Sequence, residues 1–260
     1  MPGPHAFAAT CRLITIPYSH FCEKARWALD RAEIGYREEG HLPIVSWWPV
    51  WRAGGRRTVP VLVTPNETLS DSTEILHYAD RHGRAPALFP DGNDVRDLED
   101  DFDRHVGPQS RRIAYDVLLN DRASLRRILD ASGPPWEVAV GRAARSLIAG
   151  VIRKGLRVDP VNVRRSEATL GEAFRRVDDR LRDGRPYLVG ARFSAADLTF
   201  AALAAPVVLP DEYARFLIPY PELPSAARAI IDRYRATAAG QFALQMYAKH
   251  RRPSPAVAAA

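Results

Sequence analysis

The segment RLITIPYSHFCEKARWAL, residues 12–29, changes from an extended to a helical pattern within a few positions. Residues 12–16 are largely apolar and β-branched, which favours a strand. A proline follows, and from Phe21 onward the apolar residues recur at the spacing of one helix face. The segment therefore predicts a strand that enters a helix through a short turn containing Tyr18, Ser19 and His20.

The residues after this helix extend the same α/β pattern. Gly35 is expected to end the helix, because glycine favours the backbone conformation found just past a helix C-terminus. Residues 36–39 are expected to form a second strand, which gives a βαβ unit. Residues 41–57 contain several prolines, glycines and tryptophans, and they are expected to be irregular.

A hairpin and a second helix are expected next. Residues 58–63 predict a strand that contains Pro60, and residues 68–69 predict its return strand after a turn. A helix is expected to begin in the run from residue 70, where serine, aspartate and threonine provide N-capping groups. Residues 10–83 are thus expected to form a small α/β domain.

The second part of the chain lacks convincing strand patterns. Residues 83–94 contain the glycines and prolines expected of a linker. An all-helical domain is expected over residues 94–250, so the fold class is α/β plus all-α. The expected helices cover about residues 94–129, 135–155, 161–183, 194–206, 222–236 and 238–250.

Composition narrows the class of protein. The 260 residues include 37 lysines and arginines against 31 acidic residues, a net charge of +6, and the basic residues are interleaved with acids. No nucleic-acid partner is therefore expected.

The weakly polar run at 198–210 is shorter than the ~20 residues that span a bilayer, so no membrane partner is expected either. Cys11 and Cys22 suit neither a disulfide framework nor a zinc site. The start at residues 1–5 lacks the features of a signal peptide, and a cytoplasmic protein is expected.

Ser19 and Cys22 lie three positions apart at the expected start of the first helix. Unpaired N–H groups and the helix dipole stabilise an anion or a thiolate at such a position. A simpler interpretation is that Ser19 only caps the helix and that Cys22 is a small buried apolar residue. These residues alone leave both interpretations open.

Two further motifs have similar alternatives. A cis bond between Val59 and Pro60 would turn the N–H and C=O of Val59 outward, where they could pair with an extended peptide. An ordinary proline of an edge strand would look the same in the sequence. Asp71 and Ser72 stand at a helix start, where they could hold an amino group and a carboxylate or simply cap the helix.

The order of these motifs resembles that of the cytosolic glutathione transferase superfamily, and the resemblance covers about residues 10–250. It implies a thioredoxin-like N-terminal domain, an all-helical C-terminal domain, a homodimer and glutathione as co-substrate. The matching segments are Ser19-His20-Phe21-Cys22 through Arg26-Trp27-Ala28-Leu29, Val59-Pro60-Val61-Leu62, Leu69-Ser70-Asp71-Ser72, and Tyr187-Leu188-Val189-Gly190 followed by Phe193-Ser194-Ala195-Ala196-Asp197-Leu198.

The resemblance also implies a role for each matching residue. Ser19 would stabilise the glutathione thiolate, as in serine-type relatives, and Asp71 stands where the family usually has glutamate. Arg57 and its neighbour Arg56 are the nearest candidates for the glycyl carboxylate. The expected glutathione contacts are Ser19, Phe21, Arg57, Val59, Pro60, Asp71 and Ser72.

The leading hypothesis is an enzyme that conjugates glutathione to a small hydrophobic electrophile. Two alternatives are a non-catalytic binding protein on the same fold and a glutathione thiol reductase or peroxidase that depends on Cys22. Tyr18 is a rival hydroxyl for Ser19. The electrophile is expected between the domains, near the region that holds His105, Arg112 and Tyr115. The tryptophans Trp47, Trp48 and Trp51 are candidates for packing or for the wall of this site.

Ser194 and Asp197 form the pattern of a capping box, in which each side chain reaches the backbone of the other residue. A structural role at the start of a buried helix is expected for this pair.

Overall fold

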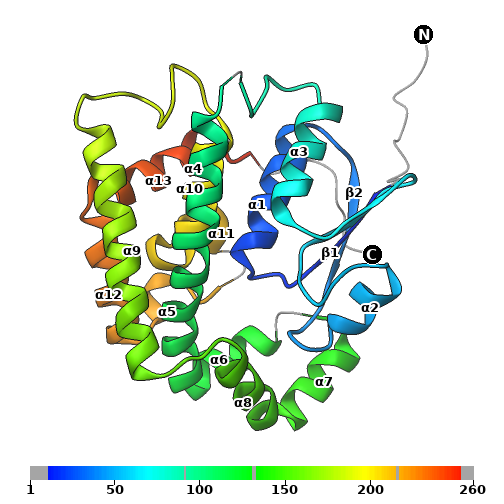
Figure 1. Ribbon diagram of the computed structural model, residues 1–260. Coiled ribbons are helices and arrows are strands. Elements are labelled where there is room, and N and C mark those ends of the chain that lie inside the picture. The colour runs from blue at the N-terminus through cyan, green and yellow to red at the C-terminus, as the bar shows by residue number, and fades with distance from the viewer. Residues whose placement is uncertain (1–10, 91, 131–132, 215–216, 253–260) are drawn as a thin grey trace.

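The computed structural model describes residues 11–90, 92–130, 133–214 and 217–252 (Figure 1). The expectation drawn from residues 1–5 lies outside these ranges. Within them, no helix combines the length and the apolar character needed to cross a bilayer.

A four-stranded sheet forms the first domain. Its strands are β1 (Cys11–Thr15), β2 (Tyr36–Gly40), β3 (Val61–Val63) and β4 (Thr68–Leu69), and their order across the sheet is β2-β1-β3-β4. Strands β1 and β2 run parallel, as a βαβ unit requires, while β3 is antiparallel to both β1 and β4. The expected α/β unit is therefore present.

Helices cover both faces of the sheet (Figure 1). Helix α1 (His20–Arg31) packs against α3 (Ser72–His82) on the side of the helical domain, and α2 (Trp47–Arg52) lies on the other side. This is the thioredoxin-like arrangement that the family resemblance implies.

The alternation of side chains along β1 and β3 explains the two covered faces. Leu13 and Leu62 are paired in register and join the large core with α1 and α3. Their neighbours Ile14 and Val61 face the opposite side and pack with Val50 of α2. Successive residues of a strand point to opposite faces, so both faces are apolar and both are buried.

Two local predictions in this domain are wrong. Helix α1 ends at Arg31, and Glu33, with φ of 57°, takes the left-handed conformation that was expected of Gly35. Residues 41–57, expected to be irregular, contain the short helix α2. Its only buried residue is Val50, and no side chain caps its N-terminus, so the usual helix signals are weak there.

The second domain is all-helical, as expected, but two of the predicted helices are divided, and the one at 135–155 is the pair α7 and α8. The expected helix at 94–129 is three helices, and α5 begins anew with Pro108 in its first turn, where a missing N–H costs no hydrogen bond. The helices are α4 (Asp94–His105), α5 (Gly107–Asn120), α6 (Arg122–Asp130), α7 (Pro135–Ala143), α8 (Arg145–Gly155), α9 (Pro160–Leu181), α10 (Ala195–Val208), α11 (Asp211–Ala214), the 3₁₀ turn η1 (Tyr220–Glu222), α12 (Ser225–Arg235) and α13 (Ala238–His250).

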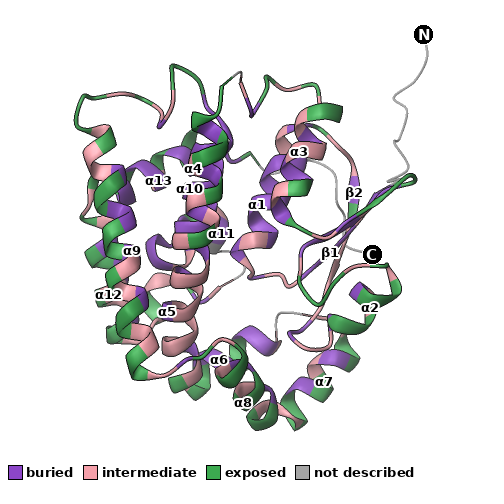
Figure 2. Cartoon of the chain, in the orientation of Figure 1, coloured by how far each residue is buried: buried purple, intermediate pink, exposed green. Residues whose placement is uncertain are grey.

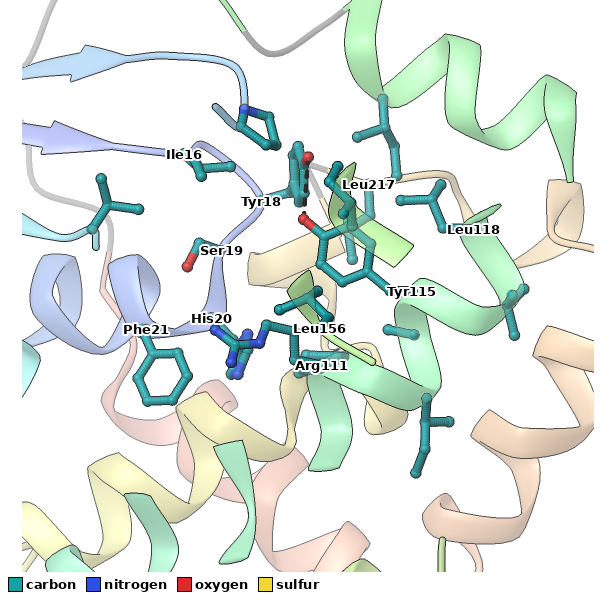
Figure 3. Close-up of a pocket in the computed structure, with 18 of the residues that line it drawn as sticks. Ile16, Tyr18, Ser19, His20, Phe21, Arg111, Tyr115, Leu118, Leu156 and Leu217 are labelled. Carbon is teal, nitrogen blue, oxygen red and sulfur yellow. Dashed lines mark hydrogen bonds between the residues drawn. The ribbon is translucent and has the colours of Figure 1, made fainter. Parts of the chain in front are cut away.

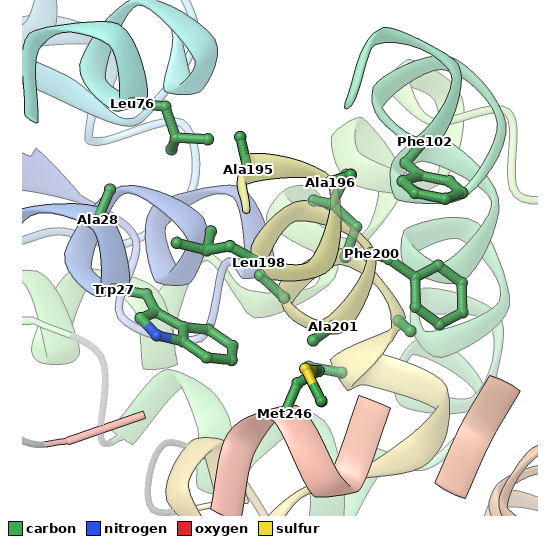
Figure 4. Packing of buried hydrophobic residues seen from close by; sticks show 14 of the residues in the cluster. Trp27, Ala28, Leu76, Phe102, Ala195, Ala196, Leu198, Phe200, Ala201 and Met246 are labelled. Carbon is green, nitrogen blue, oxygen red and sulfur yellow. The ribbon is translucent and has the colours of Figure 1, made fainter. Parts of the chain in front are cut away.

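Helix α10 is the centre of the helical domain. All of its residues except Pro206 are buried, and it packs against α1, α4, α5, α12 and α13 (Figure 2). Figure 4 shows Leu198 of α10 facing Trp27 of α1 across a continuous core. The two domains therefore share one core, and α1 is held between α3 and α10.

The Asp197 carboxylate fixes the start of α10. It accepts hydrogen bonds from the backbone N–H of Ser194 and of Leu188, each over 2.8 Å, and the Ser194 hydroxyl donates to it as well. Burial raises the pKa of Asp197 to about 6, although these hydrogen bonds favour the charged form. The expected reach of Asp197 back to the Ser194 backbone is confirmed.

Candidate active site

A cavity of about 610 Å³, here called the main cavity, lies between the two domains (Figure 3). The sheet domain contributes the turn between β1 and α1, the segment before β3 and the start of α3. The helical domain contributes mostly apolar side chains from α5, α6, α8, α10 and α12. All residues expected to contact glutathione line this cavity: Ser19, Phe21, Arg57, Val59, Pro60, Asp71 and Ser72.

Ser19 is the N-cap of α1. Its backbone N–H donates to the carbonyl of Ile16 over 2.9 Å, which closes the turn after β1. Its Oγ accepts a long hydrogen bond of 3.4 Å from the N–H of Cys22. No described residue accepts a hydrogen bond from the Ser19 hydroxyl. The half-buried hydroxyl can therefore cap the helix and still donate its proton to a ligand in the main cavity.

The bond between Val59 and Pro60 is cis, which is one of the two alternatives that the sequence left open. Strand β3 begins only at Val61, which corrects the expected strand at 58–63, because proline has no N–H for the ladder. The N–H and the C=O of Val59 make no hydrogen bond with any described residue. One donor and one acceptor of the backbone are thus unpaired at the wall of the main cavity.

Asp71 and Ser72 form the N-terminus of α3. The Asp71 carboxylate caps the helix by accepting the N–H of Thr73 over 2.8 Å, and it remains exposed. Ser72 is buried. Both residues line the main cavity, so a carboxylate and the positive end of a helix dipole meet there. This pair can hold an amino group beside a carboxylate group.

The two arginines before β3 differ in position. Arg57 lines the main cavity, and its guanidinium lies 5.8 Å from the centre of the Trp47 ring, which also lines it. Arg56 is exposed and is not among the described lining residues. Trp48 and Trp51 likewise do not line the main cavity, and they are exposed to solvent at 63% and 68%.

The helical wall corrects part of the expected electrophile site. Tyr115 lines the main cavity, as expected. His105 does not, since it bonds to Asp101 on its own helix over 2.8 Å. Arg112 also misses the main cavity and instead bonds to the Leu156 carbonyl. Its neighbour Arg111, which sequence reasoning did not single out, lines the main cavity.

Two domains of a known family match the chain. Residues 13–94 match the model of the glutathione S-transferase N-terminal domain, and residues 160–224 match that of the C-terminal domain. The chain belongs to the glutathione S-transferase superfamily. The two matches correspond to the sheet domain and to the central part of the helical domain.

Solved glutathione transferases share this fold. One from Phanerochaete chrysosporium is 19% identical, with a TM-score of 0.62 over 94% of this chain and 98% of that one. One from Ceriporiopsis subvermispora, in complex with glutathione, is 18% identical, with a TM-score of 0.61 over 95% and 100%. One from Methylobacillus flagellatus with GSH bound is 17% identical, with a TM-score of 0.52 over 90% and 98%. No curated protein sequence matches the chain.

Tyr18 is the rival of Ser19 in this glutathione S-transferase fold. Its ring is buried at the wall of the main cavity, and its hydroxyl lies 3.4 Å from that of Tyr115 (Figure 3). Burial raises the pKa of Tyr18 well above its usual range, so the phenol is neutral at physiological pH. The Tyr18 hydroxyl accepts this bond from Tyr115, and the Ser19 hydroxyl accepts one from Cys22, so each keeps its proton for a ligand. The two differ in exposure, because Tyr18 is buried and Ser19 is half-buried at the start of α1.

His20 lines the main cavity but is neutral. Its Nε2 lies 2.9 Å from the Gly107 carbonyl, which can only accept, so Nε2 carries the proton. Burial, assisted by the charge of Arg111, lowers the pKa of His20 to about 3. His20 therefore contributes a fixed hydrogen bond at neutral pH and no positive charge.

Cys22 is fully buried and does not line the main cavity. Burial raises the pKa of its thiol to about 11, and this outweighs the nearby Arg26 charge and the Ser19 hydrogen bond. Thiolate is the reactive form of cysteine. At neutral pH, Cys22 is therefore an uncharged thiol with no access to a ligand.

Proposed function

We propose that the protein is a glutathione transferase that conjugates glutathione to a small hydrophobic electrophile, with Ser19 stabilising the glutathione thiolate. The observation that carries this proposal is the Ser19 hydroxyl, which has a free proton and faces the same cavity as the unpaired Val59 backbone and the start of α3. Superfamily membership and the glutathione present in solved relatives support it.

The proposed binding mode uses one group for each part of glutathione. The N–H and C=O of Val59 pair with the cysteinyl residue, as neighbouring strands do. Asp71 holds the γ-glutamyl amine, and Ser72 holds the adjacent carboxylate at the N-terminus of α3. Arg57 receives the glycyl carboxylate, and Phe21 lines the site beside the sulfur. Asp71 is one methylene shorter than the glutamate usual in the family, so the amine lies closer to α3.

The proposed reaction is a nucleophilic substitution. The glutathione thiol loses its proton to solvent, and the thiolate accepts a hydrogen bond from the Ser19 hydroxyl. The sulfur then bonds to the electrophilic carbon, and that carbon's bond to its leaving group breaks. The leaving group departs with the electron pair, so charge and atoms balance. The apolar helical wall holds the electrophile against the sulfur.

The alternative that depends on Cys22 has little structural support. The thiol is buried, uncharged at neutral pH and outside the main cavity. A reductase or peroxidase would need an accessible thiolate at this position.

The proposal also includes domains at residues 10–83 and 94–250, a homodimer and a cytoplasmic location. The homodimer rests on the family resemblance alone.

The test is the pH dependence of kcat/KM with chlorodinitrobenzene as the electrophile. A free thiol has a pKa of ~8.5, and one hydrogen bond to the charged form is worth ~1.5–3 kcal/mol. Ser19→Ala should therefore lower kcat/KM by roughly ten- to a hundredfold near neutral pH. Most of the rate should return at alkaline pH, where the thiolate forms without help. Cys22→Ala serves as the control and should keep the wild-type profile.

Glutathione affinity, measured by calorimetry, should change much less than the rate in Ser19→Ala. Full activity of Ser19→Ala, with loss of activity in Tyr18→Phe, would transfer the role to Tyr18. A wild-type protein that binds glutathione without turning over any electrophile would instead be a binding protein on this fold.

A further inference from the structure

Arg111 is a cation in the main cavity that has no counterion among the described residues. It lies on α5 and is half-buried, and Figure 3 shows its side chain reaching toward the segment of Ser19, His20 and Phe21. Its guanidinium lies 5.7 Å from the centre of the Phe21 ring. Among the described residues, none forms a hydrogen bond or an ion pair with the Arg111 side chain.

The other buried cations of the α1 region are neutralised. Lys24 bonds to Glu99 and Asp103, Arg26 to Glu23 and Glu38, and Arg251 to Glu23 and Asp30. Each of them thus has two carboxylate partners, which offset the cost of removing a charge from water. Arg111 differs from all three, because it faces open space instead of an acid.

The groups around Arg111 do not supply a negative charge. His20 is neutral, and the Tyr115 phenol has a pKa raised by burial. Burial lowers the pKa of Arg111. Tyr115 opposes this shift, and the charge of the nearby Arg112 adds to it. A guanidinium nevertheless stays charged at neutral pH. Among the described residues that line the main cavity, Asp71 is the single acid, and it belongs to the start of α3.

A side cavity of about 290 Å³ adds to the positive potential. It adjoins the main cavity, since both are lined by Arg111, Gly155 and Leu156. Its other charged lining residues are Arg112 and Arg157. Three arginines therefore line the side cavity, and Arg111 is the one that also lines the apolar main cavity. Positive charge gathered beside an apolar cavity attracts an anion.

The remaining wall is apolar. Residues from α5, α6, α8 and α12 contribute aliphatic side chains to the main cavity: Val117, Leu118, Ile128, Ile152, Ile230 and Ile231. A ligand that satisfies both parts of this surface has an apolar body and one negatively charged group. The guanidinium of arginine suits a carboxylate or a sulfonate, with which it forms paired hydrogen bonds.

We infer that the electrophilic substrate is an anionic aromatic or aliphatic compound whose carboxylate or sulfonate binds Arg111. As a statement about the substrate, this inference rests on the proposed function. It assigns Arg111 to the electrophile, because the carboxylates of glutathione are proposed to bind at Ser72 and Arg57, on the sheet domain.

The experiment compares two unreactive ligands of the same shape, a naphthalene carboxylate and the matching neutral carboxamide. Dissociation constants are measured by calorimetry, without and with saturating S-methylglutathione. The wild-type protein should prefer the carboxylate by roughly ten- to a hundredfold, the range expected for a charge-assisted hydrogen-bond pair. Arg111→Gln should abolish this preference while leaving carboxamide binding within about twofold, because only the charge-assisted pair is lost.

Two further variants complete the series. Arg111→Lys keeps the charge without the paired geometry, so it should retain part of the preference. Arg164→Gln, an exposed residue of α9 outside both cavities, makes the same change of net charge and should bind like the wild type. Thermal unfolding should show that Arg111→Gln is folded, because it removes no ion pair.

Three results would overturn the inference. The first is a wild-type protein without carboxylate preference, and the second is an Arg111→Gln variant that keeps it or loses both ligands equally. The third is loss of the preference when S-methylglutathione is bound, since Arg111 would then hold a carboxylate of glutathione itself. A wild-type protein that shows the preference but does not bind glutathione would refute the proposed function while confirming the anion site at Arg111.

Discussion

The Nε2–H of His20 donates a hydrogen bond to the carbonyl oxygen of Gly107 over 2.9 Å, although the two residues are 87 positions apart in the chain. The bond joins the first turn of α1, directly after Ser19, to the first turn of α5. Gly107 also permits close contact, because a Cβ atom there would lie 2.4 Å from Cζ of Phe21. The two walls of the main cavity are thus fixed to each other beside the proposed thiolate site.

Stability should fall in acid because of His20. Its pKa is about 3 in the folded protein and ~6.5 when unfolded, so the unfolded state binds more protons between these values. The contribution is complete above the unfolded pKa and is lost as the pH falls through this window, amounting to about 2 kcal/mol by about pH 5. Urea unfolding of the wild type and of His20→Gln, which cannot titrate, measures the difference.

His105→Gln is the control for this measurement, because His105 is partly exposed and bonded to Asp101. That substitution should not reduce the acid sensitivity. If wild type and His20→Gln lose stability equally between neutral and acidic pH, His20 is not buried as a neutral group.

Cys22 should resist alkylation in the folded protein. Its side chain is fully buried, and burial raises the pKa of its thiol to about 11. At neutral pH the sulfur is therefore protonated, and the reagent cannot reach it. Mass spectrometry after iodoacetamide treatment should find Cys22 unmodified in buffer and modified in denaturant. Rapid modification of the folded protein, with parallel loss of activity, would instead support the mechanism that depends on Cys22.

Removal of the Asp197 carboxylate should destabilise the helical domain. Asp197→Ala leaves the buried N–H groups of Ser194 and Leu188 without acceptors, and the loss of unfolding free energy should be about 2–4 kcal/mol. Asp197→Asn keeps one acceptor oxygen and should recover part of this loss. Glutathione affinity of the folded fraction should be nearly unchanged, and a selective loss of turnover at normal stability would contradict a structural role.

The sequence allowed much of the sheet domain to be predicted, because strands β1 and β2 and helix α1 depend on local patterns. The cis bond before Pro60 was only one of two alternatives, since a trans proline in an edge strand has the same sequence. Helix α2 was missed, since one buried residue, Val50, creates no apolar period. The break before α5 was missed as well, although a glycine followed by Pro108 marks it in the sequence. Local patterns show where helices can form more reliably than where one helix ends and the next begins.

The site was predicted unevenly for a similar reason. Ser19, Val59 and Asp71 lie at turns and helix starts, whose positions follow from the sequence, and all line the main cavity. On α5, the sequence suggested Arg112 for the electrophile site, but the residue that lines the main cavity is its neighbour Arg111. Adjacent helix residues point about 100° apart, so their roles depend on how α5 is rotated against its neighbours. That rotation is set by tertiary packing, including the contact of Gly107 with Phe21.

The division of the main cavity between two parts of the chain has an evolutionary consequence. Every group proposed to handle glutathione lies before residue 73, while Arg111 and most of the apolar wall lie after residue 106. Recombination between these parts, or drift in the later one, can alter the proposed electrophile site while the proposed glutathione site is inherited unchanged. Such exchange is limited by the contact between α1 and α5. There His20 needs a backbone carbonyl as acceptor, and Phe21 needs a glycine at position 107 for close packing.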